Sequence, residues 1–170
     1  VTALVRYTDD FSSPDNNATL QKYPEVTLTG FRQPLFGSPL QLEFNAGYNP
    51  FFRQEGQKGH LWDISPTLYW PLRLGRYARA TPLAGFRGDV WERSDSGTDT
   101  GDKRGDREVF TLGTTLSTEV NRVFDVKGKE MEKVRHGIRP ELTYTYIPDA
   151  SQDNAPDYLE RIPAQHSLTY

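Results

Sequence analysis

The sequence predicts an all-β protein, an antiparallel up-and-down meander of about eight strands that forms an arc of a large transmembrane β-barrel. Four observations support this prediction. Apolar and polar residues alternate with period two along several segments. These segments are longer than the typical strand of about five or six residues. The connections between them are alternately long and short, and no segment shows helical periodicity of any length.

The clearest strand covers residues 61–74, which read LWDISPTLYWPLRL. Its even-numbered positions are apolar: Trp62, Ile64, Pro66, Leu68, Trp70 and Leu72. Its odd-numbered positions include Asp63, Ser65, Thr67 and Arg73. One apolar face with an aromatic residue near each end is typical of a barrel strand that crosses a membrane.

Similar alternation predicts the other strands in turn. It is weak in EVTLTGF (25–31) and at the two chain ends. It is clear in LQLEFNAGYN (40–49), ARATPLAGFRGDVWE (78–92), EVFTLGTTLSTEVNR (108–122) and VRHGIRPELTYTYI (134–147). The expected strands cover residues 1–8, 20–33, 39–53, 61–74, 77–92, 108–123, 134–148 and 164–170.

Three prolines, Pro66, Pro82 and Pro140, fall inside expected strands. Proline has no N–H to donate to a neighbouring strand, and a closed barrel has no free edge where that loss is harmless. We therefore expect these prolines to mark bulges or locally broken hydrogen-bond ladders.

The connections fall into two sets by their order along the chain. The first set is mostly long and polar: 9–18, 54–59, 93–106 and 149–163. The second is mostly short: 34–38, the bend near Gly75 and, as an exception, 125–133. Outer-membrane barrels have long extracellular loops and short periplasmic turns, with aromatic girdles at both interfaces. The expected girdle residues are Trp62, Trp70, Tyr77, Trp91, Phe110, Tyr144 and Tyr146.

Composition excludes several classes of function. The chain has 170 residues, a net charge of -3 and no cysteine, so its charge gives no support for nucleic-acid binding and it has no thiol chemistry. No apolar stretch approaches the roughly 18 residues of a transmembrane helix, so a membrane role falls to strands. The chain begins at VTALVRYT, without a signal peptide, and we expect it to be an internal piece of a larger protein.

Catalytic and metal-binding motifs are not evident, and we expect neither an enzyme nor a cofactor. His60, His136 and His166 lack metal-site spacing, and the aspartates of 95–106 do not match the calcium-loop pattern. Charged residues do recur at the alternate positions of each strand that carry polar side chains. On such a polar face, rows of oppositely charged residues that stabilise the sheet are more typical than a catalytic acid/base pair. The expected polar wall residues are Arg79, Arg87, Asp89, Glu119, Arg135, Arg139 and Glu141.

Several longer phrases resemble the barrel domain of the LptD family, also called OstA or Imp. They are GFRQPLFGSPL (30–40), PLRLGRY (71–77), LSTEVNRVFDV (116–126), KVRHGIRPELTYTYIPD (133–149) and ERIPAQHSLTY (160–170). The resemblance covers about residues 20–170, and RPELTYTYIPD followed by RIPAQ is its most specific part.

The resemblance implies a translocon that inserts lipopolysaccharide into the outer leaflet of the Gram-negative outer membrane. It implies a barrel of about two dozen strands, an LptE plug lipoprotein, and a periplasmic jellyroll domain that receives substrate from an LptA bridge. We expect this segment to lack the jellyroll and the strands of the lateral opening. In such a lumen, arginines would bind phosphate and carboxylates would accept hydrogen bonds from sugar hydroxyls.

Two other interpretations of the strand pattern remain open. A passive porin-like channel shares the alternation and the loop asymmetry. A soluble β-sandwich that binds carbohydrate also alternates, because one face of each of its sheets packs on the other.

Overall fold

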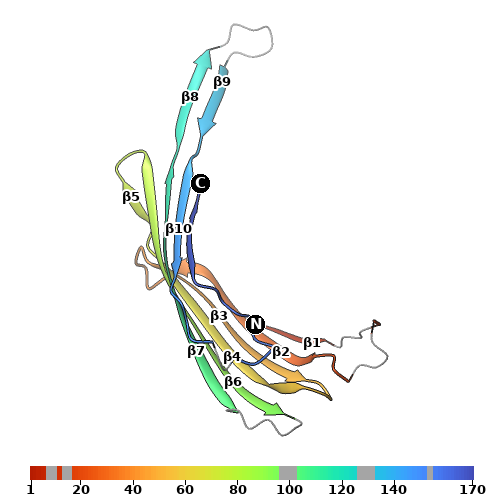
Figure 1. The fold of residues 1–170 in the computed structure, drawn as a ribbon. Coiled ribbons are helices and arrows are strands. Elements are labelled where there is room, and N and C mark those ends of the chain that lie inside the picture. The colour runs from red at the N-terminus through yellow and green to blue at the C-terminus, as the bar shows by residue number, and fades with distance from the viewer. Residues whose placement is uncertain (7–10, 13–16, 96–102, 126–132, 153–154) are drawn as a thin grey trace.

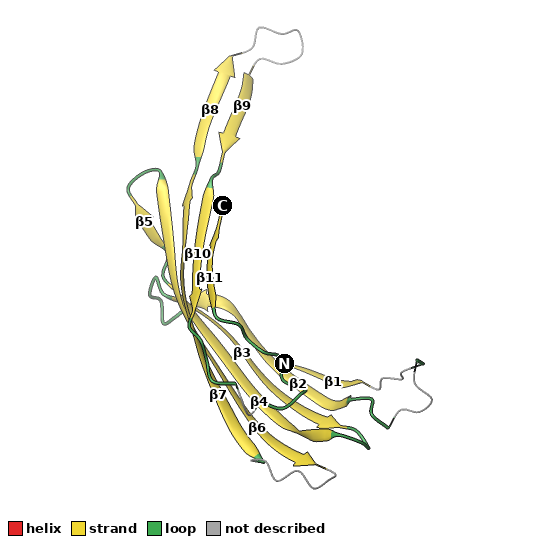
Figure 2. Cartoon of the chain, viewed as in Figure 1, coloured by secondary structure: helices red, strands yellow, loops and turns green. Residues whose placement is uncertain are grey.

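The structure is a computed structural model that describes residues 1–6, 11–12, 17–95, 103–125, 133–152 and 155–170. Strands and loops make up all of this part of the chain (Figure 2). Among the described residues, no helix is long and apolar enough to cross a membrane. Asp99 and Asp102 of the predicted acidic loop lie outside the described residues.

Eleven strands follow one another along the described part of the chain. They are β1 (Thr2–Arg6), β2 (Gln21–Pro34), β3 (Gln41–Phe52), β4 (Gln57–Tyr69), β5 (Leu72–Leu74), β6 (Ala78–Asp95), β7 (Arg104–Thr118), β8 (Val120–Asp125), β9 (Lys133–Ile138), β10 (Glu141–Ile147) and β11 (Gln165–Thr169).

The main sheet has the order β1-β2-β3-β4-β6-β7-β10-β11, with β5 paired to β6. Every pairing is antiparallel, and the order of strands across the sheet is their order along the chain, with β5 and the β8–β9 hairpin off this path. Figure 1 shows a curved sheet that stays open, with β1 and β11 at its two edges. The predicted all-β meander of about eight strands is therefore confirmed.

Three expected strands are interrupted in the structure. The strand over 61–74 separates into β4 and β5, 108–123 into β7 and β8, and 134–148 into β9 and β10. The last two breaks face each other across one hairpin, whose register is the same on both sides: Leu116 pairs with Leu142, and Val120 with Ile138. At the break, the Thr118 N–H donates to the Pro140 carbonyl over 3.2 Å. Pro140 has no N–H to donate in return.

The other two prolines also lie at interrupted ladders. Between β4 and β6, pairs form at Ile64 and at Thr67 but not at Pro66. The Trp70 N–H donates to the Pro82 carbonyl over 2.9 Å just after β4 ends, and Pro82 again cannot donate in return. The prediction that these prolines mark locally broken ladders is confirmed for Pro66 and Pro140, and Pro82 accompanies the end of β4.

The sheet has two chemically different faces. The apolar face carries large exposed side chains from successive strands: Leu28, Trp62, Ile64, Leu68, Trp70, Val90, Phe110, Leu112, Leu116, Leu142, Tyr144 and Leu168. No second sheet packs on this face within the described part of the chain, as a β-sandwich would require. An exposed apolar surface of this extent is typical of a face that contacts lipid or protein.

The hairpin of β8 and β9 projects beyond the other strands (Figure 1). All of its strand residues are exposed. Two of its even-numbered pairs continue the apolar face, Val120 opposite Ile138 and Phe124 opposite Val134, and the pair between them is Arg122 opposite His136.

Candidate functional site

The polar face of the sheet, opposite the apolar face, holds the predicted polar wall. Cross-strand pairs show this directly: Arg79 pairs with Ser117, which pairs with Glu141, and all three side chains share one face. The seven predicted residues then separate into two groups. Arg87 and Asp89 lie toward the long loops, and the other five lie toward the short turns.

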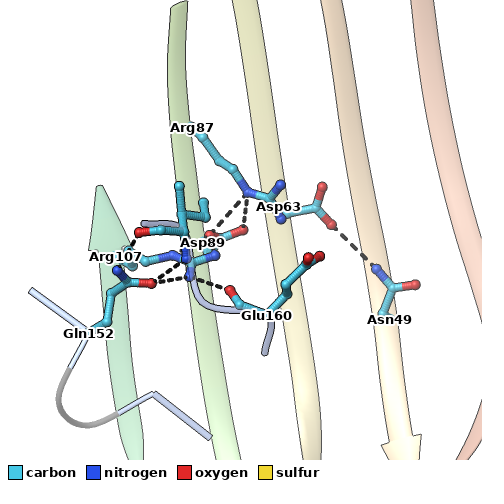
Figure 3. A network of polar contacts seen from close by, with 8 residues as sticks. Asn49, Asp63, Arg87, Asp89, Arg107, Gln152 and Glu160 are labelled. Atoms are coloured by element: carbon cyan, nitrogen blue, oxygen red, sulfur yellow. Dashed lines mark hydrogen bonds and ion pairs between the residues drawn. The ribbon is translucent and has the colours of Figure 1, made fainter. Parts of the chain in front are cut away.

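The first group is centred on a buried ion pair between Asp89 and Arg107 (Figure 3). Asp89 is 0% exposed and Arg107 is 2% exposed. The Arg107 Nε and Nη2 atoms donate to Asp89 Oδ2 over 2.8 and 2.5 Å. Arg87 Nε donates to both oxygens of Asp89, over 3.1 and 3.2 Å. Because the cost of burying a charge is high, this carboxylate needs both arginines.

The arginines also neutralise a pair of like charges. Asp63 on β4 lies directly opposite Asp89 on β6. Two carboxylates in such a position repel each other unless cations lie between them. In Figure 3, Arg87 extends between the two aspartates, and the Asn49 amide donates to Asp63 from the other side over 3.3 Å.

The described parts of the connection after β10, residues 149–152 and 155–163, which we call the strap, fold back over the polar face at this end. Arg107 Nη1 donates to Gln152 Oε1 (2.9 Å) and to the Glu160 carbonyl (2.7 Å). Gln152 accepts from the Ile162 N–H (2.8 Å) and donates to the Ile162 carbonyl (2.7 Å), which closes the strap on itself. The strap is therefore held by a buried polar network.

Apolar contacts hold the strap as well. Phe51, Leu61 and Trp91 project from the polar face and form a buried cluster with Leu159 of the strap. Tyr158 stacks on Phe51 with ring centroids 4.4 Å apart. This cluster corrects the prediction for Trp91, which is 3% exposed beneath the strap and does not lie on the apolar face with the other girdle candidates. Its odd number places it on the polar parity of β6, opposite Leu61.

Most other girdle candidates lie on the apolar face. Trp62, Trp70, Phe110 and Tyr144 are all exposed there, and Tyr146 is partly covered by the ring of His166 at 4.7 Å. Tyr77 instead lines a hollow on the polar face, because it follows the turn that ends β5. Their membership of an interfacial girdle stays a prediction.

The second group of polar residues surrounds Glu119, between β7 and β8. Its carboxylate accepts from Asn121 (2.8 Å) and forms ion pairs with Arg139 (3.2 Å) and Arg135 (3.6 Å). The hydrogen bond from Asn121, followed by the hydrogen bond and charge of Arg139, holds the pKa of Glu119 below its ordinary value of 4.5. The hydrogen bonds stabilise the charged form of the carboxylate.

Protonation of Glu119 is expected to loosen the base of the β8–β9 hairpin. Since the pKa is lowered in the fold, the stabilising contribution is present above the ordinary pKa and disappears as pH falls through the lowered value. Hydrogen exchange of β8 and β9, corrected for intrinsic rates, should show protection that decreases below about pH 4.5. Glu119→Gln should remove this pH dependence, and an identical pH profile in the variant would contradict the assignment.

The sequence does not predict every residue of the site. Arg107 falls in an expected loop, because the alternation predicts a strand that begins at residue 108, yet β7 begins at Arg104. Extending the period-two pattern back from Val109 would place Arg107 at an odd-numbered position, on the polar face of the strand. Gln152 gives no such signal, because it belongs to a connection without periodicity.

The three histidines do not lie together. The His60 ring packs against both Tyr48 and Trp62, with Nδ1 2.9 Å from the Tyr48 hydroxyl. His166 packs on Tyr146, and His136 lies on the exposed β9. Among the residues that the structure describes, no group of three acidic, histidine or cysteine side chains could hold a metal ion.

The amino-acid sequence of the chain matches a model of a known protein family. The family model described as "LptD: LPS transport system D" matches residues 1–160. No curated protein is similar enough to the chain to count as a match.

Proposed function

The chain belongs to the LptD family of lipopolysaccharide (LPS) transport proteins, and from this membership we propose that it forms part of the translocon that inserts LPS into the outer leaflet of the Gram-negative outer membrane. The family match over residues 1–160 is the observation that carries the proposal. LptD is a transport family, with LPS as its substrate.

The two faces of the sheet support a barrel wall. We propose that the apolar face contacts the lipid of the outer membrane and the polar face lines the lumen, because barrel strands alternate in this way. The sheet is curved and both of its edge strands have one unpaired side, so further strands could extend it. On this proposal the long loops are extracellular and the short turns face the periplasm.

The partners follow from the same proposal. An LptE-like lipoprotein would occupy the lumen next to this wall. An LptA-like bridge would deliver LPS through a jellyroll domain to the short-turn end. The saccharide would then move along the polar face, where threonines such as Thr115 and Thr143, 3.2 Å apart, offer hydroxyl groups to it.

Photo-crosslinking in the full-length protein tests this proposal. A photoreactive amino acid at Thr81 or Thr115, which pair on the polar face, should crosslink to LPS only while LPS is being delivered from the periplasmic side. The same probe at Leu112, on the apolar face, should crosslink to membrane lipid regardless of delivery.

Depletion of the protein provides the second measurement. We expect surface LPS to fall when the protein is depleted. Normal surface LPS after depletion, together with solute flux through the purified protein in liposomes, would instead favour a passive porin-like channel and overturn the proposal.

A further inference from the structure

A hollow of about 890 Å³ opens on the polar face at the short-turn end, away from the strap. It lies between the turn that joins β5 to β6 and the two strand breaks of the long hairpin. Its charged lining residues are Arg73, Arg76, Arg79, Arg139, Glu119 and Glu141. Its volume is in the range of sites for small molecules or for the head group of a larger one.

The carboxylates of the hollow neutralise its arginines only in part. Glu119 already has Arg139 and Arg135 as partners. Arg73 and Arg79 form no ion pair with any residue that the structure describes. The hollow therefore carries a positive charge that the described part of the chain leaves uncompensated.

Arg73 and Arg79 are both exposed, and their positions also make them repel each other. The two residues are direct cross-strand partners on β5 and β6. Like charges directly opposite each other destabilise a strand pair. At the other end of the sheet, Arg87 and Arg107 neutralise the similar repulsion between Asp63 and Asp89. Between β5 and β6, an anion bound between the two guanidinium groups would have the same effect.

Phosphate is the anion that this arrangement fits. A guanidinium group presents a planar fork of donors that matches phosphate oxygens, and two such groups on neighbouring strands of one hollow suit a dianionic phosphomonoester. The remaining carboxylate, Glu141, lines the same hollow and could accept hydrogen bonds from sugar hydroxyls.

We propose that Arg73 and Arg79 bind a phosphate group of a phosphorylated saccharide in this hollow. The inference rests on the proposed function and deepens it, because it assigns the phosphate-bearing part of LPS to one site on the polar face. At the short-turn end, this site would be among the first parts of the wall to meet the substrate, whereas the strap covers the opposite end.

The test is LPS binding to the full-length protein in detergent, measured by calorimetry. Arg73→Gln/Arg79→Gln should weaken binding of phosphorylated LPS by about 10-fold to 100-fold, since the variant loses charge-assisted hydrogen bonds to the phosphate. Binding of enzymatically dephosphorylated LPS should not change. The matched control is Arg32→Gln/Arg104→Gln, which removes two exposed arginines that have acidic partners and should leave both affinities unchanged.

Three outcomes would overturn the inference. Unchanged binding by the double variant would show that phosphate is not bound at this site. An equal loss of binding to phosphatidylglycerol micelles would show a general lipid head-group site. If the double variant does not fold, as judged by heat-dependent gel migration, Arg73→Gln alone should still weaken LPS binding by about threefold or more, and no change would refute the site. Failure of the wild-type protein itself to bind or deliver LPS would refute the proposed function instead.

Discussion

Arg107→Gln is expected to destabilise the protein by about 3 to 5 kcal/mol, because removal of one partner of a buried ion pair leaves the other charge uncompensated. Asp89 is fully buried, and Arg87 alone would remain to neutralise it. The variant also loses the donor that holds Gln152 and the Glu160 carbonyl. Urea unfolding of the full-length protein in detergent, followed by tryptophan fluorescence, measures the change.

Arg104→Gln is the matched control for this prediction. Arg104 lies on the same strand and pairs with Glu92 at 3.1 Å, but both side chains are largely exposed. Exposed ion pairs typically contribute about 0 to 1 kcal/mol. Equal effects of the two substitutions would show that burial of the Asp89 pair does not matter for stability.

Trp91→Ala is expected to free the strap from the polar face. The indole is 3% exposed and packs in the cluster that includes Leu159. Truncation of a buried tryptophan typically costs about 3 to 5 kcal/mol, through lost burial and the cavity left behind. In this cluster the lost packing is between β6 and the strap, so the substitution should destabilise the attachment of the strap. Arg161 in the strap is exposed, and trypsin should cleave after it much faster in the variant.

Two further variants separate packing from a general loss of stability. Trp62→Ala removes an indole that is 43% exposed on the apolar face and should leave cleavage after Arg161 unchanged. Leu159→Ala alters the strap side of the same cluster and should accelerate cleavage. If Trp91→Ala and Leu159→Ala both left the cleavage rate at the wild-type value, the cluster would not be what holds the strap.

Strand parity made most of the fold predictable. In β4, the alternation of Trp62, Ile64 and Leu68 with Asp63 and Thr67 is a local property, because successive side chains on a strand point to opposite faces. The same rule predicts Arg79 and Glu141 on one polar face, and the structure connects their strands through β7.

Strand ends were less predictable, because they depend on the neighbouring strand. Pro140 is visible in the sequence, but the break that it makes needs Thr118 opposite it. The early start of β7 at Arg104 likewise follows from its pairing with Glu92 of β6. A ladder is a property of two strands, so one strand alone does not reveal where it is interrupted.

The amino-acid sequence by itself determined the antiparallel meander, the two faces and the family, because alternation and motifs depend only on residues that are close together in the sequence. Only the tertiary structure decided which charges meet. Arg107 reaches Gln152 and the Glu160 carbonyl through a return of the chain over the polar face. Arg73 and Arg79 are cross-strand partners because the register of β5 and β6 sets them opposite each other. Neither has an acidic partner among the described residues. Such contacts join residues far apart in sequence or across two strands, and periodicity carries no information about them.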